Sequence, residues 1–505
     1  MNKDLQHFKK VEKELSLLEG MLALLQWDRA TIMPESAIEQ RAEQSSIISE
    51  MLYTKTISKE FRAVISKLAK KSTFSRLDKA DQLSVSKYKK QIAKEKKIPL
   101  SFVKEYSELV TKANAAWENA KEKNKFSLFK PYLEKIIAMQ QKEAKIINPK
   151  LHPYDFLLDE FEEGMNIAKL NKVFEKLKVG LIEILTNIKS SAVYKKQKNH
   201  LVGRLFPIEG QERVTGQIKD LILDNHTRNL MAESVHPFTT AINGDDVRIT
   251  TAYDEKDPMF SFKAVAHESG HALYELGFSK KLQYTIMAKA PSIGLHESQS
   301  RFWENFITKS KAFWSYYYPT YKKIFSKQLS SMNLNEFYKQ ANFVQPSNIR
   351  VLADEVTYCL HIIIRFELER ELMENSLKVK DLPKAWNKKY KEYLGIVPQN
   401  DKVGVLQDTH WSMGLIGYFP TYAIGTMYAA SIYYQIRKEL PGINQQISKG
   451  NVKPIRNWLH KNIHQYGSTM LAHDIIAKSC GKELDSEDLI KYLKDKYYGI
   501  YGVKN

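Results

Sequence analysis

The residues best suited to chemistry lie in one short segment near the middle of the chain, His267-Glu268-Ser269-Gly270-His271. The segment is predicted to be helical, because Asp257 and Pro258 suit the start of a helix and Gly277 suits its end. Residues four apart share one face of a helix, so both histidines can present a ring nitrogen to one Zn²⁺ ion. Glu268 lies beside them, placed to take a proton from metal-activated water. The segment therefore predicts a catalytic metal site rather than two structural histidines on a surface helix.

A catalytic zinc site has three protein ligands and one open position, so a third ligand is needed. The extended form of the motif does not supply it, because Tyr274 replaces its glycine and Gly277 replaces its third histidine. The downstream segment 291–307 is the next source, and it places several polar residues on one helical face: Glu297, Ser300, Arg301 and Glu304. Such a polar face either meets solvent or lines a site. Considered without the rest of the chain, solvent exposure is the favoured interpretation. Glu297 is the preferred third ligand, and Glu304 and His296 are lesser candidates.

The rest of the chain predicts a largely helical scaffold for these residues. Only 21 of 505 residues are glycine and 16 are proline, and helical spacing of apolar residues recurs at 101–122, 130–149 and 167–190. A turn signal followed by alternating β-branched residues predicts one small sheet at 240–253. No linker or repeat divides the chain. We expect one domain over 1–505, with 1–200 as an N-terminal helical layer over a catalytic half at 201–505.

Charge and cysteine usage narrow the function classes. Lysine and arginine total 77 against 58 acidic residues, a formal net charge of +19. Lysine carries the excess and no nucleic-acid-binding signature is present, so we expect a solvated basic surface and no nucleic-acid partner. Cys359 and Cys480 are far apart and lack CxxC partners, which is typical of a reducing compartment.

Two further segments bear on membranes. The N-terminal residues show no apolar signal core followed by a cleavage site. Residues 409–436 contain no Asp, Glu, Lys or Arg, yet they hold glycines, a proline and five tyrosines, so a helix pair buried inside the protein is the better interpretation. We expect a soluble, cytoplasmic protein without a membrane partner.

An ordered series of motifs resembles a known family, the metallocarboxypeptidases of the thermostable carboxypeptidase Taq type (peptidase family M32). The resemblance covers nearly the whole chain, but Ala252 stands where a larger basic residue is expected, and the charge of +19 is unusually high. The motifs that carry it are LLQWDRATIMP at 24–34, His236-Pro237-Phe238, Asp246-Val247-Arg248-Ile249-Thr250, the HExxH segment, His296-Glu297-Ser298, Ile349-Arg350-Val351-Leu352-Ala353-Asp354, Gly404-Val405-Leu406-Gln407-Asp408-Thr409-His410-Trp411 and GYFPTYAIG at 417–425.

This resemblance implies a nearly all-α fold with a deep central groove, a homodimer, and one Zn²⁺ or Co²⁺ ion per chain. It implies release of single amino acids from the C-termini of peptides. The implied metal ligands are His267, His271 and Glu297, with Glu268 as general base.

Recognition of a terminal carboxylate favours a guanidinium group, which can bind it with two parallel hydrogen bonds. Arg350 lies in an apolar run and is the first candidate for this anchor; the alternative is an ion pair with nearby Asp354 or Glu355. Arg248 is the second candidate, on the strand face opposite Val247 and Ile249, where an ordinary cross-strand ion pair is equally favoured.

The remaining assignments follow the resemblance and the chemistry of the reaction. His410 and Tyr422 are assigned as donors to the oxyanion, with Tyr418 as the rival and core packing as the alternative for either tyrosine. His236 is expected in the groove, near the substrate. Asp354, and likewise Gln407 and Asp408, are expected to hold the second ring nitrogen of a ligand histidine.

Two other functions remain open on sequence grounds. A helical oligoendopeptidase has the same metal core but ignores the terminal carboxylate. A non-enzymatic basic protein with a structural zinc closes its site with a fourth ligand and has no use for Glu268.

Overall fold

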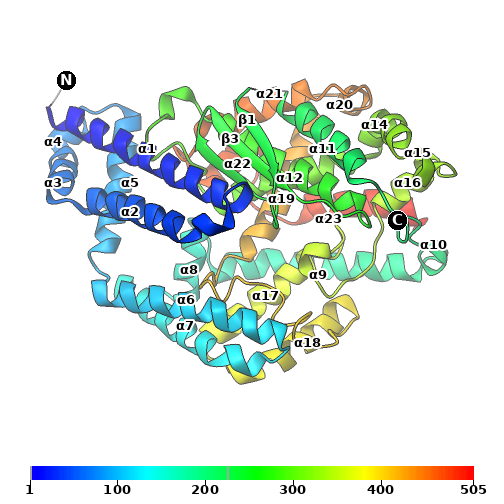
Figure 1. Cartoon of the computed structure of the whole chain (residues 1–505), viewed down its shortest axis with the longest axis horizontal. Coiled ribbons are helices and arrows are strands. Elements are labelled where there is room, and N and C mark those ends of the chain that lie inside the picture. The colour runs from blue at the N-terminus through cyan, green and yellow to red at the C-terminus, as the bar shows by residue number, and fades with distance from the viewer. Residues whose placement is uncertain (1–2, 225–226, 505) are drawn as a thin grey trace.

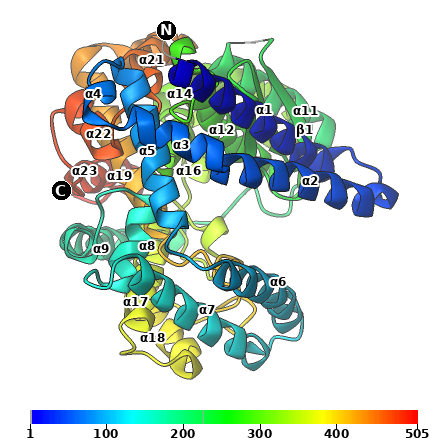
Figure 2. The same cartoon turned by 90° about the vertical axis from the view of Figure 1, so that its left-hand side faces the viewer.

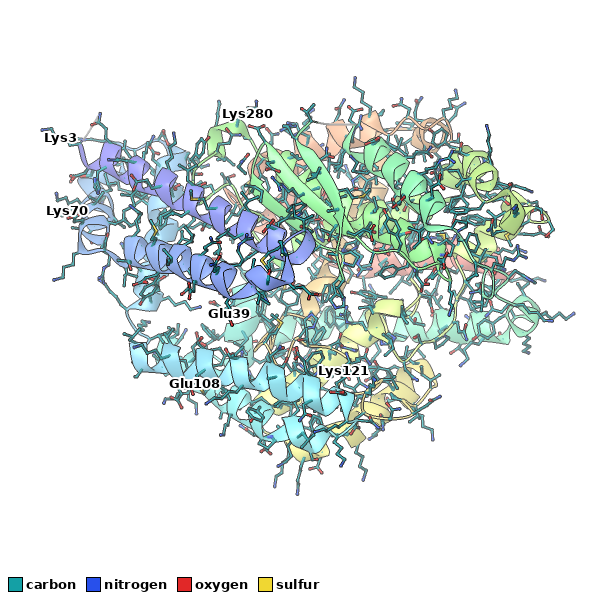
Figure 3. All side chains as sticks on the ribbon, viewed as in Figure 1. Lys3, Glu39, Lys70, Glu108, Lys121 and Lys280 are labelled. Atoms are coloured by element: carbon teal, nitrogen blue, oxygen red, sulfur yellow. The ribbon has the colours of Figure 1, made fainter. Side chains whose placement is uncertain are left out.

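The computed structural model describes residues 3–224 and 227–504, and helices dominate it (Figure 1). The described residues contain one small sheet, and helix α12 (Pro258–Leu276) packs against it. This confirms the predicted mainly α fold with a small sheet beside the HExxH helix. Charged side chains such as Lys3, Lys70 and Lys280 project from the periphery (Figure 3).

The first five helices form a unit with a small core of its own at one end of the molecule (Figure 2). The buried side chains of this core include Phe8, Phe61 and Tyr88, whose rings pack against one another. The helices are α1 (Lys3–Thr31), α2 (Ile38–Ile57), α3 (Lys59–Leu68), α4 (Lys71–Phe74) and α5 (Lys79–Glu95), with a 3₁₀ turn η1 (Glu35–Ala37) between the first two.

A lower layer lies beneath these helices and beneath the sheet (Figures 1 and 2). It joins helices from two distant parts of the sequence, because α17 packs against α7, α8 and α9. Its members are α6 (Leu100–Glu122), α7 (Phe126–Ile147), α8 (Pro153–Phe161), α9 (Ile167–Ser190), α17 (Tyr358–Met373), η5 (Val379–Asp381) and α18 (Leu382–Leu394). The main hydrophobic core therefore combines helices from both sides of residue 200.

The sheet has the strand order β1-β3-β2, formed by β1 (Asn229–Glu233), β2 (Thr239–Asn243) and β3 (Asp246–Thr251). β3 pairs with β1 in parallel and with β2 in antiparallel register, so β2 is an edge strand. Val247 and Ile249 are fully buried while Arg248 points to the other face, as their alternation predicts. The sequence predicts β2 and β3 but not β1, which lies outside 240–253.

The uncharged segment 409–436 forms one buried helix, not a pair. Turns occupy residues 409–419, and α19 (Pro420–Glu439) follows them. Glycines at 414 and 417 adopt positive φ angles, which explains why a helix cannot start earlier. Within the described residues, no helix is both long enough and apolar enough to cross a membrane.

Most of the remaining elements lie in the upper layer around α12 and α19, whereas the first of them packs against α9 and α23. They are α10 (Ala192–Lys196), α11 (Ile208–Leu223), η2 (Lys280–Leu282), α13 (Ile293–Arg301), η3 (Phe302–Thr308), α14 (Lys311–Ile324), α15 (Ser326–Leu329), α16 (Leu334–Ala341), η4 (Arg350–Leu352), α20 (Ile443–Ile447), α21 (Lys453–Asn462), η6 (His464–Tyr466), α22 (Ala472–Cys480) and α23 (Glu487–Tyr501).

Candidate metal centre and active site

Helix α12 carries the HExxH segment and begins and ends where its caps predict. The Asp257 carboxylate accepts a hydrogen bond from the backbone N–H of Met259 at 3.1 Å, Pro258 is the first helical residue, and Gly277 is the C-cap. His267 and His271 therefore lie one turn apart on the same face, with ring centroids 4.9 Å apart.

Two glycines let a second helix bring Glu297 to these histidines. A Cβ at Gly270 of α12 would lie 2.5 Å from the carbonyl oxygen of Gln299 on α13. A Cβ at Gly425 of α19 would lie 2.8 Å from the side chain of Glu297 itself. Because neither glycine has a side chain, α12 and α19 both pack closely against α13. The position of Glu297 thus depends on residues far from it in sequence.

Three donor atoms converge in the arrangement that a tetrahedral metal ion requires. The ligand atoms of His267, His271 and Glu297 all lie within 4.8 Å of one another. Glu297 Oε2 is 3.5 Å from His267 Nε2 and 3.4 Å from His271 Nε2. Two ligands bound tetrahedrally at roughly 2.0–2.1 Å from Zn²⁺ are about 3.3 Å apart, so the donor set fits such an ion.

A buried charge network orients these candidate ligands. Glu304 Oε2 lies 2.9 Å from His267 Nδ1, and Arg301 donates to Glu297 Oε1 at 2.7 Å and to Glu304 Oε2 at 3.2 Å. Burial opposes the charge of Glu297, but Arg301 and His267 hold the pKa of its carboxyl well below the usual range. Arg301 therefore occupies one carboxylate oxygen of Glu297 and leaves the other toward the histidines.

The lesser ligand candidates lie around the centre rather than in it. Glu304 holds the second nitrogen of His267 from the π-helical segment η3, and such segments recur at functional sites. His296 stacks on His271 with ring centroids 4.4 Å apart, and its Nε2 lies 2.8 Å from Glu275. The polar face of 291–307 does not meet solvent, which is the alternative favoured when the face is taken alone: Glu297, Ser300 and Glu304 are buried, and α12 and α19 pack against α13.

Glu268 is buried beside the donors, with 7% of its surface exposed. Thr239 of β2 donates from its hydroxyl to Glu268 Oε2 at 2.6 Å. Burial raises the pKa of Glu268 above its ordinary value, which strengthens the carboxylate as a base. Nothing in the sequence pattern singles out Thr239, although it directly follows the His236-Pro237-Phe238 motif.

His410 and Tyr422 form a pair, with His410 Nε2 3.2 Å from the Tyr422 hydroxyl oxygen. Burial lowers the pKa of His410 to about 4 although Asp408 opposes the shift, so the imidazole is neutral near pH 7. The His410 ring also stacks on Phe419 at 4.3 Å. The rival Tyr418 lies close by, with its ring centroid 5.5 Å from that of Tyr422.

Arg350 lies beside this pair and is linked to the metal centre through Tyr358. Its guanidinium group is 5.0 Å from the Tyr422 ring centroid and donates to the Tyr358 hydroxyl at 3.3 Å. The guanidinium group of Arg301 also lies over the Tyr358 ring, 4.0 Å from its centroid. The acidic partner of Arg350 is Asp408, at 3.0 Å and 2.9 Å, and not Asp354 or Glu355.

The structure also corrects the expected roles of three polar residues near Arg350. Asp408 bridges Arg350 and Arg365, and Gln407 accepts from the backbone N–H of Arg350 and from Arg365. Asp354 accepts hydrogen bonds from Gln345, Val356 and Thr357. These contacts hold the arginines and the start of α17, whereas the contact to His267 is made by Glu304. Sequence spacing cannot reveal this, because the partners meet only through tertiary packing.

Two other predicted residues lie near β2. Arg248 forms a two-pronged ion pair with Asp246 of its own strand, at 2.9 Å and 2.8 Å, and lies over the Trp27 ring. Its partner is thus two residues away on the same strand rather than across the sheet. His236 is exposed in the loop before β2, three residues from Thr239.

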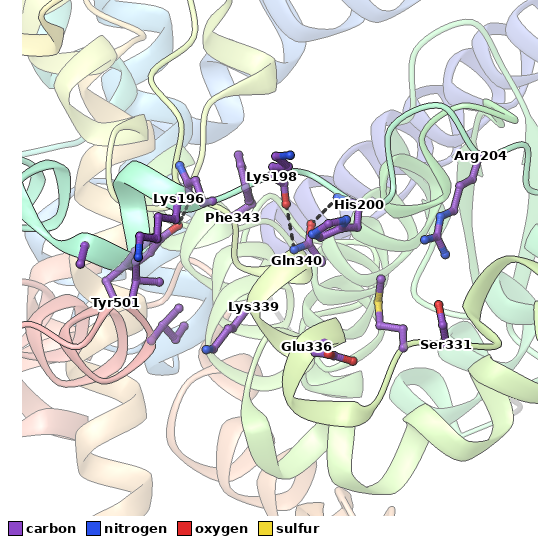
Figure 4. Close-up of a pocket in the computed structure, with 15 residues that line it drawn as sticks. Lys196, Lys198, His200, Arg204, Ser331, Glu336, Lys339, Gln340, Phe343 and Tyr501 are labelled. Carbon is purple, nitrogen blue, oxygen red and sulfur yellow. Dashed lines mark hydrogen bonds between the residues drawn. The ribbon is translucent and has the colours of Figure 1, made fainter.

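A large surface cavity lies apart from these residues (Figure 4). It measures about 630 Å³ and lies between α10, α16 and the end of α23, with exposed lysines such as Lys196 and Lys339 around it. None of the predicted site residues lines it.

The donor triad, the adjacent buried carboxylate and the neutral His–Tyr pair define a metal-dependent hydrolase. The comparisons with known proteins agree. The model of the carboxypeptidase Taq (M32) metallopeptidase family matches residues 7–497. The chain therefore belongs to the carboxypeptidase Taq (M32) metallopeptidase family, and it is a metallocarboxypeptidase that hydrolyses peptide bonds.

Individual relatives are similar along their whole length. Carboxypeptidase 1 of Bacillus subtilis is 38% identical over 489 residues, which cover 97% of each chain. Thermostable carboxypeptidase 1 of Pyrococcus furiosus is 36% identical over 94% of each chain. The crystal structure of an M32 carboxypeptidase from Deinococcus radiodurans has a TM-score of 0.95 at 32% identity, covering 99% of this chain and 100% of that one.

Proposed function

We propose that the chain removes single amino acids from peptides with a free C-terminus, at a site built from His267, His271, Glu297 and Glu268. The observation that carries this proposal is the convergence of three ligand atoms within 4.8 Å, directly beside a buried carboxylate. The peptide enters between the upper and lower layers.

The proposed metal is one Zn²⁺ or Co²⁺ ion per chain, held by His267, His271 and Glu297. A bound ion of this kind lowers the pKa of water and polarises the scissile carbonyl group. Two imidazoles and one carboxylate are a donor set that zinc prefers, and the 3.4–3.5 Å separations support it.

Glu268 acts as the general base and then as the general acid. Its carboxylate accepts a proton from the attacking water and returns that proton to the amine of the leaving residue. The Thr239 hydroxyl fixes one carboxylate oxygen, which leaves the other oxygen to receive the proton. His410 and Tyr422 act on the other side of the reacting carbonyl, where the Tyr422 hydroxyl donates to the oxygen that gains charge.

Arg350 is the proposed anchor for the terminal carboxylate. Two guanidinium groups, those of Arg350 and Arg365, share the single carboxylate of Asp408. This trio has a net charge of +1, which a substrate carboxylate can neutralise. Arg248 is less suited because Asp246 already pairs with it in two-pronged geometry, and it is proposed together with His236 to border the groove near β2.

Mass spectrometry of one peptide with a free and with an amidated C-terminus tests this function. We expect a ladder of one-residue losses from the free form alone, abolished by a chelator and restored by Zn²⁺ or Co²⁺. Internal cleavage of both forms would instead identify the oligoendopeptidase. Metal binding without cleavage of either form would identify the non-enzymatic alternative.

We further propose a homodimer in the cytoplasm. Helix α2 has no buried residue among those described, and exposed apolar side chains of α1 and α2 support a second copy as its cover: Leu17, Met21, Leu24, Ile47 and Met51. Met21→Glu combined with Met51→Glu is expected to convert a dimer to a monomer in light scattering, and an unchanged mass would reject this face. The two unpaired cysteines support a reducing compartment, which cell fractionation tests.

A further inference from the structure

An unpaired lysine projects from the metal-binding helix. Lys263 lies on α12 four residues before His267, so both side chains share one face of the helix. It is half-buried, and within the described part of the chain it makes no hydrogen bond or ion pair. Burial lowers the pKa of its ammonium group, while Asp257 acts against that shift from a distance. Burying a charge without a partner raises the free energy of the folded protein, and a ligand of opposite charge would lower it again.

Lys263 lines a cavity of about 470 Å³. The start of α12, Lys309, the loop at 345–347 and the residues after Arg350, Leu352 and Ala353, also bound it. The cavity therefore lies between the helix that carries the metal ligands and the segment that carries the proposed carboxylate anchor.

Each acidic side chain of this cavity has at least one partner, although Glu355 Oε1 has none among the described residues. Asp257 caps α12, Asp354 accepts four hydrogen bonds, and Glu355 forms an ion pair with Lys496 at 2.7 Å. Lys309 is likewise engaged, because it donates to Asn305 at 2.8 Å and lies 3.5 Å from Glu304. Lys256 at the rim is exposed to water, so among the described residues Lys263 is the half-buried positive charge of this cavity that has no partner.

We propose that this cavity receives the side chain of the substrate's C-terminal residue, and that Lys263 binds the carboxylate of a C-terminal glutamate or aspartate there. The inference rests on the proposed carboxypeptidase function. The cavity is bounded by Lys263, one helical turn before His267, and by Leu352 and Ala353, which follow Arg350 in sequence. The proposal places the last side chain of the peptide in this space, with the scissile carbonyl at Glu268 and the terminal carboxylate at Arg350.

The surface cavity of Figure 4 supplies a matched control. It shares Gln340 and Phe343 with the Lys263 cavity, and its exposed Lys339 also makes no ion pair among the described residues. Lys263→Met and Lys339→Met remove the same charge from similar elements, but only the first removes it from the cavity beside α12.

The test compares kcat/KM for peptides that differ only in ending in Glu, Gln or Leu, with wild type, Lys263→Met, Lys263→Glu and Lys339→Met. A hydrogen bond between Lys263 and the carboxylate of a C-terminal Glu joins two charged groups. We therefore expect kcat/KM to be roughly ten-fold or more higher for Glu than for Gln in the wild type and in Lys339→Met. We expect this ratio to fall to about one in Lys263→Met, with the Leu peptide unaffected. A fourth peptide, which ends in Lys, is included for Lys263→Glu, and this variant is expected to favour it. Calorimetric binding of free glutamate against glutamine gives the same comparison without turnover.

Several outcomes would overturn the inference. One is a wild-type enzyme that trims all three peptides without preference for Glu, which leaves the proposed function intact. Another is a Glu preference that survives in Lys263→Met. A third is an equal fall in kcat/KM for all three peptides in Lys263→Met. That result would mean that Lys263 binds the terminal carboxylate or stabilises the folded protein. Absence of any C-terminal trimming would instead reject the proposed function. The calorimetric comparison of glutamate with glutamine would then show on its own whether Lys263 binds a carboxylate.

Discussion

Glu268 is the side chain that would make the proposed metal site catalytic, because it supplies the general base. It is buried next to the donor triad and has a hydroxyl partner on only one carboxylate oxygen. A carboxylate in this setting has the raised pKa and the free lone pair that proton transfer needs.

Glu268→Gln keeps the shape of the side chain and removes the base. We expect kcat to fall by about 10²–10⁴-fold, the range for loss of general acid–base catalysis, while metal content and melting temperature stay the same. Single-turnover assays on metal-loaded protein measure this. A variant with more than a tenth of the wild-type rate would reject Glu268 as the base.

Thr239→Val tests the partner of that base through the pH profile. The Thr239 hydroxyl stabilises the ionised carboxylate, so its removal is expected to raise the pKa of Glu268 further. The base must be ionised to work, and the acid limb of kcat/KM against pH therefore moves to higher pH. Thr240→Val, one residue along the same strand, is the control. An unmoved acid limb in Thr239→Val would contradict this role.

At the scale of helices, the proposed metal site depends on the close approach of α12 to α13. Gly270→Ala places a methyl group 2.5 Å from the Gln299 carbonyl, so the helices must separate and Glu297 must move away from the histidines. We expect metal affinity to fall by about ten-fold or more, as for other changes in the support of metal ligands.

Gly216→Ala is the matched control for this variant. Gly216 lies inside α11, and a Cβ there meets no described atom within 4 Å. Alanine is the better helix former, so this change is expected to stabilise the protein by up to about 1 kcal/mol without affecting metal binding. Equal metal affinity in the two variants would show that the glycine contact does not position Glu297.

Elements differ in how far the sequence alone predicts them. The HExxH helix is predicted with both ends, because its caps are local signals. Strand β1 is missed, because its five residues pair with β3 in parallel and carry little pattern of their own. The ion pair of Arg350 with Asp408 also escapes local analysis, because it joins residues 58 apart in sequence. Glu297 emerges as a ligand candidate, but the contacts of Arg301 with Glu297 and of Glu304 with His267 form only once α12 and α19 bury that face.

At the scale of the molecule, the metal centre ties distant parts of the chain together. The proposed ligands come from α12 and α13; β2 packs against α12, α19 packs against α13, and α17 of the lower layer packs against α19. An ion that binds only the folded chain therefore stabilises all of it. The division into a layer at 1–200 and a catalytic half stays a prediction, since helices from both sides of residue 200 share the main core.

Metal removal is expected to lower the melting temperature of the whole protein in one transition. With free Zn²⁺ at about 100 times its dissociation constant, the expected stabilisation is about 2.7 kcal/mol. Glu297→Gln removes one proposed ligand, so its melting temperature should respond little to Zn²⁺. Differential scanning calorimetry with and without a chelator measures both, and an equal zinc response in the variant would place the ion elsewhere.

The most direct test of the account is an anomalous-scattering map of the metal-loaded Glu268→Gln variant, collected at the absorption edge of the bound ion. We predict one strong peak per chain, within bonding distance of His267 Nε2, His271 Nε2 and Glu297 Oε2, with an open position facing residue 268. A peak at other residues, or one enclosed by a fourth protein ligand, would contradict the proposed catalytic centre.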